Sequence, residues 1–139
     1  MIVLRRATQD DAMVLLQWQQ HPDTRRHART PAVPTETEHL AWFRQKLADP
    51  DCVFLLAELN SERVGTIRLD RRGDEWEVSI VVAPHTRGRG LGTSMLAALD
   101  EITRGDKLVA EIHPDNQASD ALFRTAGYRR CADRLYRKP

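Results

Sequence analysis

Three glycines at alternate positions, Gly88, Gly90 and Gly92, separate a strand-like run from a helix-like run of the sequence. Glycine adopts backbone conformations that other residues avoid, and it lets a ligand approach the main chain closely. The stretch therefore predicts a strand, a tight corner and a helix in direct succession. An ordinary strand-to-helix connection with no ligand remains the alternative.

The segments around this corner predict an α+β (mixed α/β) fold in one domain, residues 1–139. The predicted strands are residues 2–6, 52–59, 64–70, 75–82 and 107–112, followed by a closing hairpin over 128–137. The predicted helices are a segment with Met13, Leu15, Leu16 and Trp18 on one face, a segment from Thr35 to before Asp49, about 90–103, and about 116–126. Thr8–Asp11 and Thr35–Glu38 resemble capping boxes at the first two helix starts. A meander followed by a crossover is typical of this class.

Composition excludes several classes of protein. Basic and acidic residues number 21 and 20, so the net charge of +1 argues against a nucleic-acid-binding protein. No apolar run approaches the roughly 20 residues of a membrane span, and the N-terminus lacks the features of a secretion signal, so we expect a cytoplasmic protein without a membrane partner. Cys52 and Cys131 form no CxxC or Cys/His cluster, so no disulfide framework or metal site is expected.

The glycine corner has the properties of a phosphate site. Main-chain amides of the loop and the first amides of the helix point into one concavity at the positive end of the helix dipole. Arg87 and Arg89 add positive charge at its rim. No Gly-Lys-Ser/Thr follows, which excludes a Walker A loop, and the glycine spacing does not fit a dinucleotide fingerprint.

The spacing Arg87-x-x-Gly90-x-Gly92 resembles the coenzyme motif of the GCN5-related N-acetyltransferases. A second stretch, His113–Ser119 followed by Leu122-Phe123 and Gly127-Tyr128, resembles the second conserved block of that family. The resemblance implies a central, mixed but mostly antiparallel twisted sheet of about six to seven strands flanked by about four helices. Its fourth and fifth strands would splay apart, often with a bulge in the fourth.

The resemblance also implies acetyl-CoA as co-substrate. The pantetheine arm would pair with main-chain groups near Val81 and Val82, and the diphosphate would lie on amides of residues 88–92. The residues assigned in this way to acetyl-CoA are Val81, Val82, Arg87, Gly88, Arg89, Gly90, Leu91, Gly92, Thr93, Asn116, Phe123 and Arg124. For Asn116, a helix N-cap is an equally good interpretation, and one does not exclude the other.

The implied reaction is direct attack of a neutral primary amine on the thioester. Glu77, in the strand that lines the cleft, is the candidate to accept the proton, often through a water, although a solvent-facing strand residue explains it equally well. A backbone N–H near Val82 would hold the developing oxyanion. Phe123 stands where the family often has a tyrosine that protonates the leaving thiolate, so no general acid is assigned.

The acceptor site of the family is built by the first two helices and the loop between them. Here that region carries Arg25, Arg29, His39 and Trp42, and it resembles acetyltransferases that act on nucleotide-linked amino sugars. A solvated basic loop over core aromatics is the alternative. We therefore expect a small-molecule amine as partner, with a homodimer left open. Acetylation of a protein N-terminus and a non-catalytic acetyl-CoA-binding module are the two other hypotheses.

Overall fold

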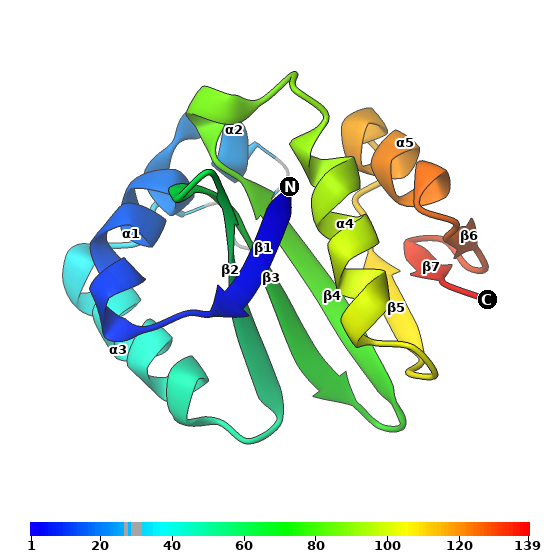
Figure 1. Cartoon of the computed structure of the whole chain (residues 1–139), viewed down its shortest axis with the longest axis horizontal. Helices are drawn as coiled ribbons and strands as arrows, with labels where there is room; N and C mark the ends of the chain where they lie inside the picture. The colour runs from blue at the N-terminus through cyan, green and yellow to red at the C-terminus, as the bar shows by residue number, and fades with distance from the viewer. Residues whose placement is uncertain (27, 29–31) are drawn as a thin grey trace.

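Seven strands form one mixed sheet in the order β1-β2-β3-β4-β5-β7-β6 (Figure 1). The computed structural model describes residues 1–26, 28 and 32–139. The strands are β1 (Ile2–Arg6), β2 (Cys52–Leu59), β3 (Glu62–Arg72), β4 (Glu75–Val82), β5 (Leu108–Glu111), β6 (Arg129–Arg130) and β7 (Leu135–Arg137). Neighbouring strands are antiparallel except β4 and β5, which are parallel and joined by a crossover helix. The predicted α+β class and mostly antiparallel sheet are confirmed.

Helices cover both faces of this sheet. They are α1 (Ala12–Gln20), α2 (Pro22–Arg25), α3 (Glu36–Ala48), α4 (Leu91–Ile102) and α5 (Gln117–Thr125). Figure 1 shows α1, α2 and α3 on one side and α4 and α5 on the other. The short α2 lies in a stretch predicted to be irregular. Pro22 occupies its first turn, where proline is tolerated, and the His21 ring accepts the Asp23 N–H at 3.1 Å.

Both predicted capping boxes are present. Glu38 accepts the backbone N–H of Thr35, and the Thr35 hydroxyl accepts that of Glu38. Asp11 accepts the Thr8 N–H at 2.8 Å where a 3-10 turn leads into α1. The Asp11 carboxylate is fully buried and also binds Arg5 and Arg63, which ties α1 to the edge of the sheet.

The expectation of a bulge in the fourth strand, β4, is wrong. β4 pairs with β3 in unbroken register from Gly65↔Val82 to Arg72↔Glu75, and the irregularity lies in β2 between Ala57 and Glu58. The splay beside β4 therefore arises because the short β5 departs from it. β3 begins before residue 64, because Asn60 and Ser61 alone form the preceding turn, both with positive φ. It continues past residue 70, because its pairing with β4 extends to Arg72↔Glu75.

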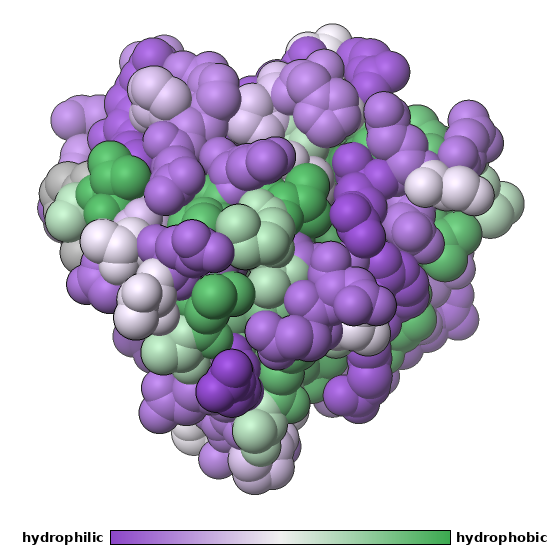
Figure 2. All heavy atoms as spheres, turned by 90° about the vertical axis from the view of Figure 1, so that its left-hand side faces the viewer, coloured by the Kyte–Doolittle hydropathy of each residue, from purple (hydrophilic) through white to green (hydrophobic). Residues whose placement is uncertain are grey.

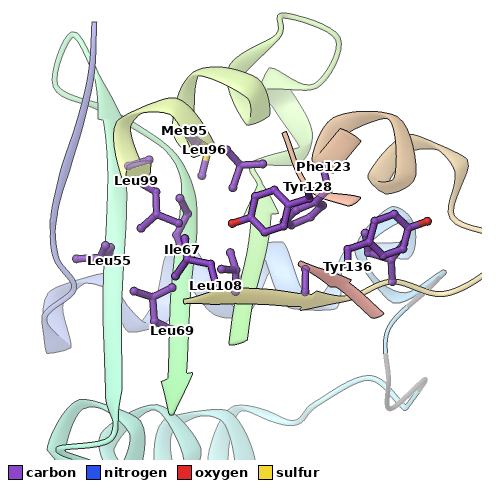
Figure 3. Packing of buried hydrophobic residues seen from close by; sticks show 14 of the residues in the cluster. Leu55, Ile67, Leu69, Met95, Leu96, Leu99, Leu108, Phe123, Tyr128 and Tyr136 are labelled. Atoms are coloured by element: carbon purple, nitrogen blue, oxygen red, sulfur yellow. The ribbon is translucent and has the colours of Figure 1, made fainter. Parts of the chain in front are cut away.

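Two apolar clusters hold the layers together. The larger one packs α4 and α5 on the sheet and includes Ile67, Met95, Leu99 and Phe123 (Figure 3). The smaller one packs α1 and α3 on the opposite face and includes Phe43. Side chains of β4 therefore alternate, with even-numbered residues packed toward α4 and odd-numbered residues turned toward α3.

The outer surface over α1 and α3 is mixed in character. Figure 2 shows this side as mainly hydrophilic, with apolar side chains in small groups between the hydrophilic ones. Within the described residues, no helix combines the length and the apolar character that crossing a bilayer requires.

Candidate active site

β4 and β5 separate shortly after they meet. Their pairing is limited to Trp76↔Leu108 and Glu77↔Val109, and the Trp76 N–H donates to the Lys107 carbonyl at 2.8 Å. The rest of β4 has β3 as its partner on one edge only. The predicted splay between the fourth and fifth strands is confirmed.

The alternation of backbone groups shows which residues of β4 face the open edge. The Ala83 N–H donates toward β3, to the Val64 carbonyl, and the Val81 carbonyl also lies against β3 at Gly65. Because successive residues of a strand direct their N–H and C=O groups to opposite edges, the main chain of Ile80 and Val82 faces the gap. Ile80, which the sequence did not single out, thus takes the main-chain position expected of Val81.

The glycine corner has the geometry expected of it. Gly88 and Gly90 have φ of 83° and 71°, in the left-handed region that glycine adopts readily. Gly90 is the N-cap of α4 and supplies no side-chain cap, so the amides of Leu91, Gly92 and Thr93 keep their hydrogens directed outward. Gly92 has a packing role, because a Cβ there would lie 3.2 Å from the Leu122 side chain.

Thr86 holds the corner in place, a role that the sequence did not reveal. Its hydroxyl is completely buried and donates to the Ala83 carbonyl at 2.9 Å, which closes the 3-10 turn Pro84–Thr86. The only local signal is a hydroxyl residue directly after Pro84-His85, a weak pattern. The glycines therefore follow a rigid turn.

The two arginines of the motif differ in position. Arg87 lines the cleft; its Nε donates to the Val82 carbonyl at 3.4 Å and its Nη2 donates to the Thr24 hydroxyl at 3.2 Å. Arg89 lies outside the cleft lining, with its Nη2 at 3.8 Å from a Glu62 carboxylate oxygen. The structure thus brings only Arg87 to the site.

The second conserved block is divided in the same way. Asn116 lines the cleft and caps α5, since its Oδ1 accepts the Ser119 N–H at 3.0 Å. Phe123 also lines the cleft and packs edge-on against Tyr128 (Figure 3). Arg124 instead lies in a smaller hollow, where it donates to Asp120, which the Tyr136 hydroxyl also binds. Tyr128 was predicted to begin the closing hairpin, but it lies just before β6 and is not a strand residue.

One continuous cleft of about 1530 Å³ joins the glycine corner, the splay and the face of α3. Its described lining contains five arginines and five carboxylates, so the charge is nearly balanced. The arginines are Arg25, Arg26, Arg68, Arg87 and Arg134, and the carboxylates are Asp23, Glu38, Glu77, Glu111 and Asp115.

Glu77 lies on the cleft wall and is mostly buried. Its side chain is 15% exposed, and a carboxylate oxygen lies 3.8 Å from Nη1 of Arg72. A carboxylate in this position is within the same cleft as the predicted acceptor residues Arg25, His39 and Trp42.

The predicted acceptor residues have unequal exposure. Trp42 and Arg25 line the cleft, and Nη2 of Arg25 donates to Gln19 at 2.6 Å. His39 touches the cleft but is only 3% exposed; its Nε2 donates to the Ala12 carbonyl at 2.9 Å, and burial lowers its pKa, so the ring is neutral. Arg29 lies outside the described residues.

A charged cluster on β3 was missed. The Arg68 Nε donates to Asp70 at 2.7 Å, the Lys46 Nζ donates to the other oxygen of Asp70 at 2.9 Å, and the Arg68 guanidinium lies 5.2 Å from the centre of the Trp42 ring. Burial alone would raise the pKa of Asp70, but the hydrogen bonds from Lys46 and Arg68 hold it below its usual value. The alternation of polar Thr66, Arg68 and Asp70 with apolar neighbours is the signal that could have indicated this face.

Comparison with known proteins identifies the family. The model of the acetyltransferase (GNAT) domain matches residues 2–129, and the chain belongs to this family. The N-alpha-acetyltransferase RimI of Mycobacterium tuberculosis is 35% identical over 95 residues, which cover 65% of this chain and 60% of that protein. The mycothiol acetyltransferase of a Nocardioides species is 41% identical over 58 residues, 41% of this chain and 20% of that protein. The chain thus matches only part of each curated relative.

Solved structures share the whole fold. The aminoglycoside acetyltransferase AAC(6')-Ib in complex with coenzyme A superposes with a TM-score of 0.86 at 21% identity, covering 99% of this chain and 94% of that chain. RimL, a ribosomal L7/L12 alpha-N-protein acetyltransferase in complex with coenzyme A, gives 0.83 at 18% identity, covering 99% and 93%. At these identities the likeness concerns the fold alone.

Proposed function

We propose that the protein transfers the acetyl group of acetyl-CoA to the primary amine of a small molecule. The observation that carries this proposal is the union, in one cleft, of a glycine corner at a helix N-terminus with a strand edge that has lost its partner. The first feature suits a diphosphate, and the second suits an amide-containing arm that adds to the sheet.

The cleft offers groups for the diphosphate and for the pantetheine arm of the coenzyme. Amides of residues 88–93 would hold the diphosphate with Arg87 beside it, and the main chain of Ile80 and Val82 would pair with the pantetheine arm. Asn116 uses its Oδ1 as a cap, which leaves its amide N–H groups to donate toward the arm. Phe123 supplies an apolar wall.

Acetyl-CoA supplies an activated acyl carbon, and the residues of the chain manage the proton and the charge. The amine nitrogen forms a bond to this carbon, the carbon–sulfur bond breaks, and the ammonium proton passes to Glu77 directly or through water. The Val82 N–H, which faces the gap, would bind the oxyanion. Phe123 has no proton to donate, so water or a neighbouring residue would protonate the leaving thiolate.

The charge balance of the cleft limits the class of acceptor that it can bind. A polycationic amine requires an excess of carboxylates, whereas the part of the lining that the structure describes holds five arginines and five carboxylates. A nucleotide-linked amino sugar fits better, because Arg25 would bind its diphosphate and Trp42, next to His39, would cover a ring face. Arg29, outside the described residues, stays a prediction for the same role.

Acetylation of a protein N-terminus is the second candidate. It is favoured by the identity with RimI, whose name gives it this activity. The large cleft would admit a peptide end, but its arginines suit an anionic or neutral peptide rather than a basic one.

Two measurements test the proposal. Acetyl-CoA should raise the melting temperature, because a ligand that binds only the native state stabilises it. Release of free thiol over a panel of amines then separates an enzyme from a binding module. A melting temperature unchanged by saturating acetyl-CoA would contradict the proposal, and binding without thiol release would leave only a coenzyme-binding role.

A further inference from the structure

The floor of the cleft beside Glu77 is a charged face that the coenzyme does not need. On β3, Arg68 and Asp70 lie opposite Ser79 and Glu77 of β4, so the four side chains share the face of the sheet turned toward α3. Asp70 does not line the cleft, whereas Arg68 does. Asp70 therefore acts from behind, as a support for the arginine.

Arg68 is held in a fixed orientation. Its Nε is bound to Asp70 at 2.7 Å, and its guanidinium carbon lies over the Trp42 ring, 5.2 Å from the ring centre. Among the residues that the structure describes, Nη1 and Nη2 of Arg68 have no hydrogen-bond partner, and the side chain is 24% exposed. Two parallel N–H donors on a guanidinium form the group that binds carboxylate or phosphate in two-point geometry.

The local charge also favours an anionic ligand at Arg68. Lys46 and Arg68 share the single carboxylate of Asp70, so this group of three keeps one positive charge in excess. Glu77 is already beside a different cation, Arg72. An anion bound at Arg68 would neutralise this excess charge.

We propose that Arg68 is an acceptor-binding residue that selects amines carrying a carboxylate or phosphate. This inference rests on the proposed acetyl transfer and names the class of its acceptor. Ser79, opposite Arg68, is two residues from Val81, so the anion would lie about 7 Å along the strand from the reacting end of the splay. Amine and anion thus belong to the same small molecule or to one peptide end.

Binding to the protein saturated with coenzyme A, where no turnover occurs, tests the proposal. The probes are two matched pairs: glucosamine 6-phosphate with glucosamine, and the dipeptide amide Asp-Ala with Asn-Ala. Calorimetry gives the affinities. The fluorescence of Trp42, identified by its loss in Trp42→Phe, reports binding at the neighbouring Arg68 guanidinium. The pair that shows the preference distinguishes a phosphate source from a carboxylate source.

Arg68→Gln is the test variant and Arg71→Gln its matched control. Arg71 also lies on β3, covers a tryptophan (Trp76, 4.5 Å) and bridges an aspartate (Asp51, 3.3 Å), but it does not line the cleft. We expect the wild type and Arg71→Gln to bind the anionic member of one pair about tenfold more tightly, and Arg68→Gln to show at most about a twofold preference. The melting temperature of each variant with coenzyme A confirms that its fold is intact.

Two results would overturn the inference: equal affinity for both members of both pairs in the wild type, or a preference that survives Arg68→Gln. Failure of coenzyme A to bind at all is a separate result. It would overturn the proposed function, and the inference with it.

Discussion

The two ends of the cleft are built in different ways. The coenzyme corner consists of main-chain groups from one continuous segment, Pro84–Thr93, whose shape is set by glycines and a 3-10 turn. The acceptor floor consists of side chains from α3, β3 and β4, held by ion pairs such as Arg68–Asp70 and Lys46–Asp70. Main-chain groups suit a coenzyme that many related enzymes share. Side chains suit a specific acceptor, because substitutions can change them without disturbing the backbone.

The largest effect should come from the side-chain end. Glu77→Gln removes the proton acceptor and should lower kcat by about 10²- to 10⁴-fold. Acetyl-CoA affinity should stay unchanged, because the glycine corner is untouched. Steady-state kinetics and calorimetry measure the two quantities. Glu75→Gln is the control, since Glu75 lies on the same strand but binds Arg137 outside the cleft; equal kcat values for the two variants would remove Glu77 from the reaction.

Substitution of the buried Asp11 should lower the stability of the protein more than the other substitutions. Asp11→Asn leaves Arg5 and Arg63 without their carboxylate and should lower the free energy of unfolding by roughly 2–4 kcal/mol, less than for a wholly buried pair because both arginines are partly exposed. Urea unfolding measures this loss. Asp74→Asn, which breaks the exposed pair with Lys107, should change stability little.

The same carboxylate predicts a pH dependence. Burial alone would raise the pKa of Asp11, but hydrogen bonds from Arg5 and the Thr8 N–H hold it below its usual value. A depressed folded-state pKa means that the ionised group stabilises the fold above about pH 4 and that this contribution is lost as the pH falls through the folded value. Asp11→Asn should flatten the fall in stability below about pH 4. An unchanged slope would show that other carboxylates control it.

At the backbone end, Gly90→Ala should weaken acetyl-CoA binding without an effect specific to the acceptor. Alanine is strained at φ 71°, by about 1–2 kcal/mol, and relief of this strain would displace the amides of the corner. We expect affinity to fall about tenfold. Gly73→Ala meets the same strain at φ 66° with no atom within 4 Å of the added Cβ, but far from the corner. Equal losses of acetyl-CoA affinity in Gly90→Ala and Gly73→Ala would show that lowered stability, and not a displaced corner, weakens binding.

The smallest effect should separate the arginines. Arg87→Ala should weaken acetyl-CoA binding by about three- to tenfold, as expected for one charged hydrogen bond at a partly exposed site. Arg124→Ala should change it by less than about twofold, since Arg124 is engaged by Asp120 in the other hollow. The reverse order would return Arg124 to the role that the family resemblance gave it.

The same contrast explains what the sequence could predict. The meander, the crossover helix and the glycine corner depend on local backbone preferences, so short patterns such as Arg87-x-x-Gly90-x-Gly92 were sufficient. Whether Ile80 or Val81 directs its main-chain groups to the gap depends on the register of β4 with β3. No short sequence pattern indicates this register. Arg68 and Lys46, 22 residues apart in the sequence, share Asp70 only because the side chain of Lys46 on α3 reaches across to β3.

Amide hydrogen exchange with and without acetyl-CoA would show directly where the coenzyme lies on the chain. We expect new protection of the amides of Gly88 to Thr93 and of Ile80 and Val82, with little change at amides of β4 already paired with β3, such as Val81. Binding of acetyl-CoA without protection at the glycine corner, or with protection confined to another surface, would contradict this expectation.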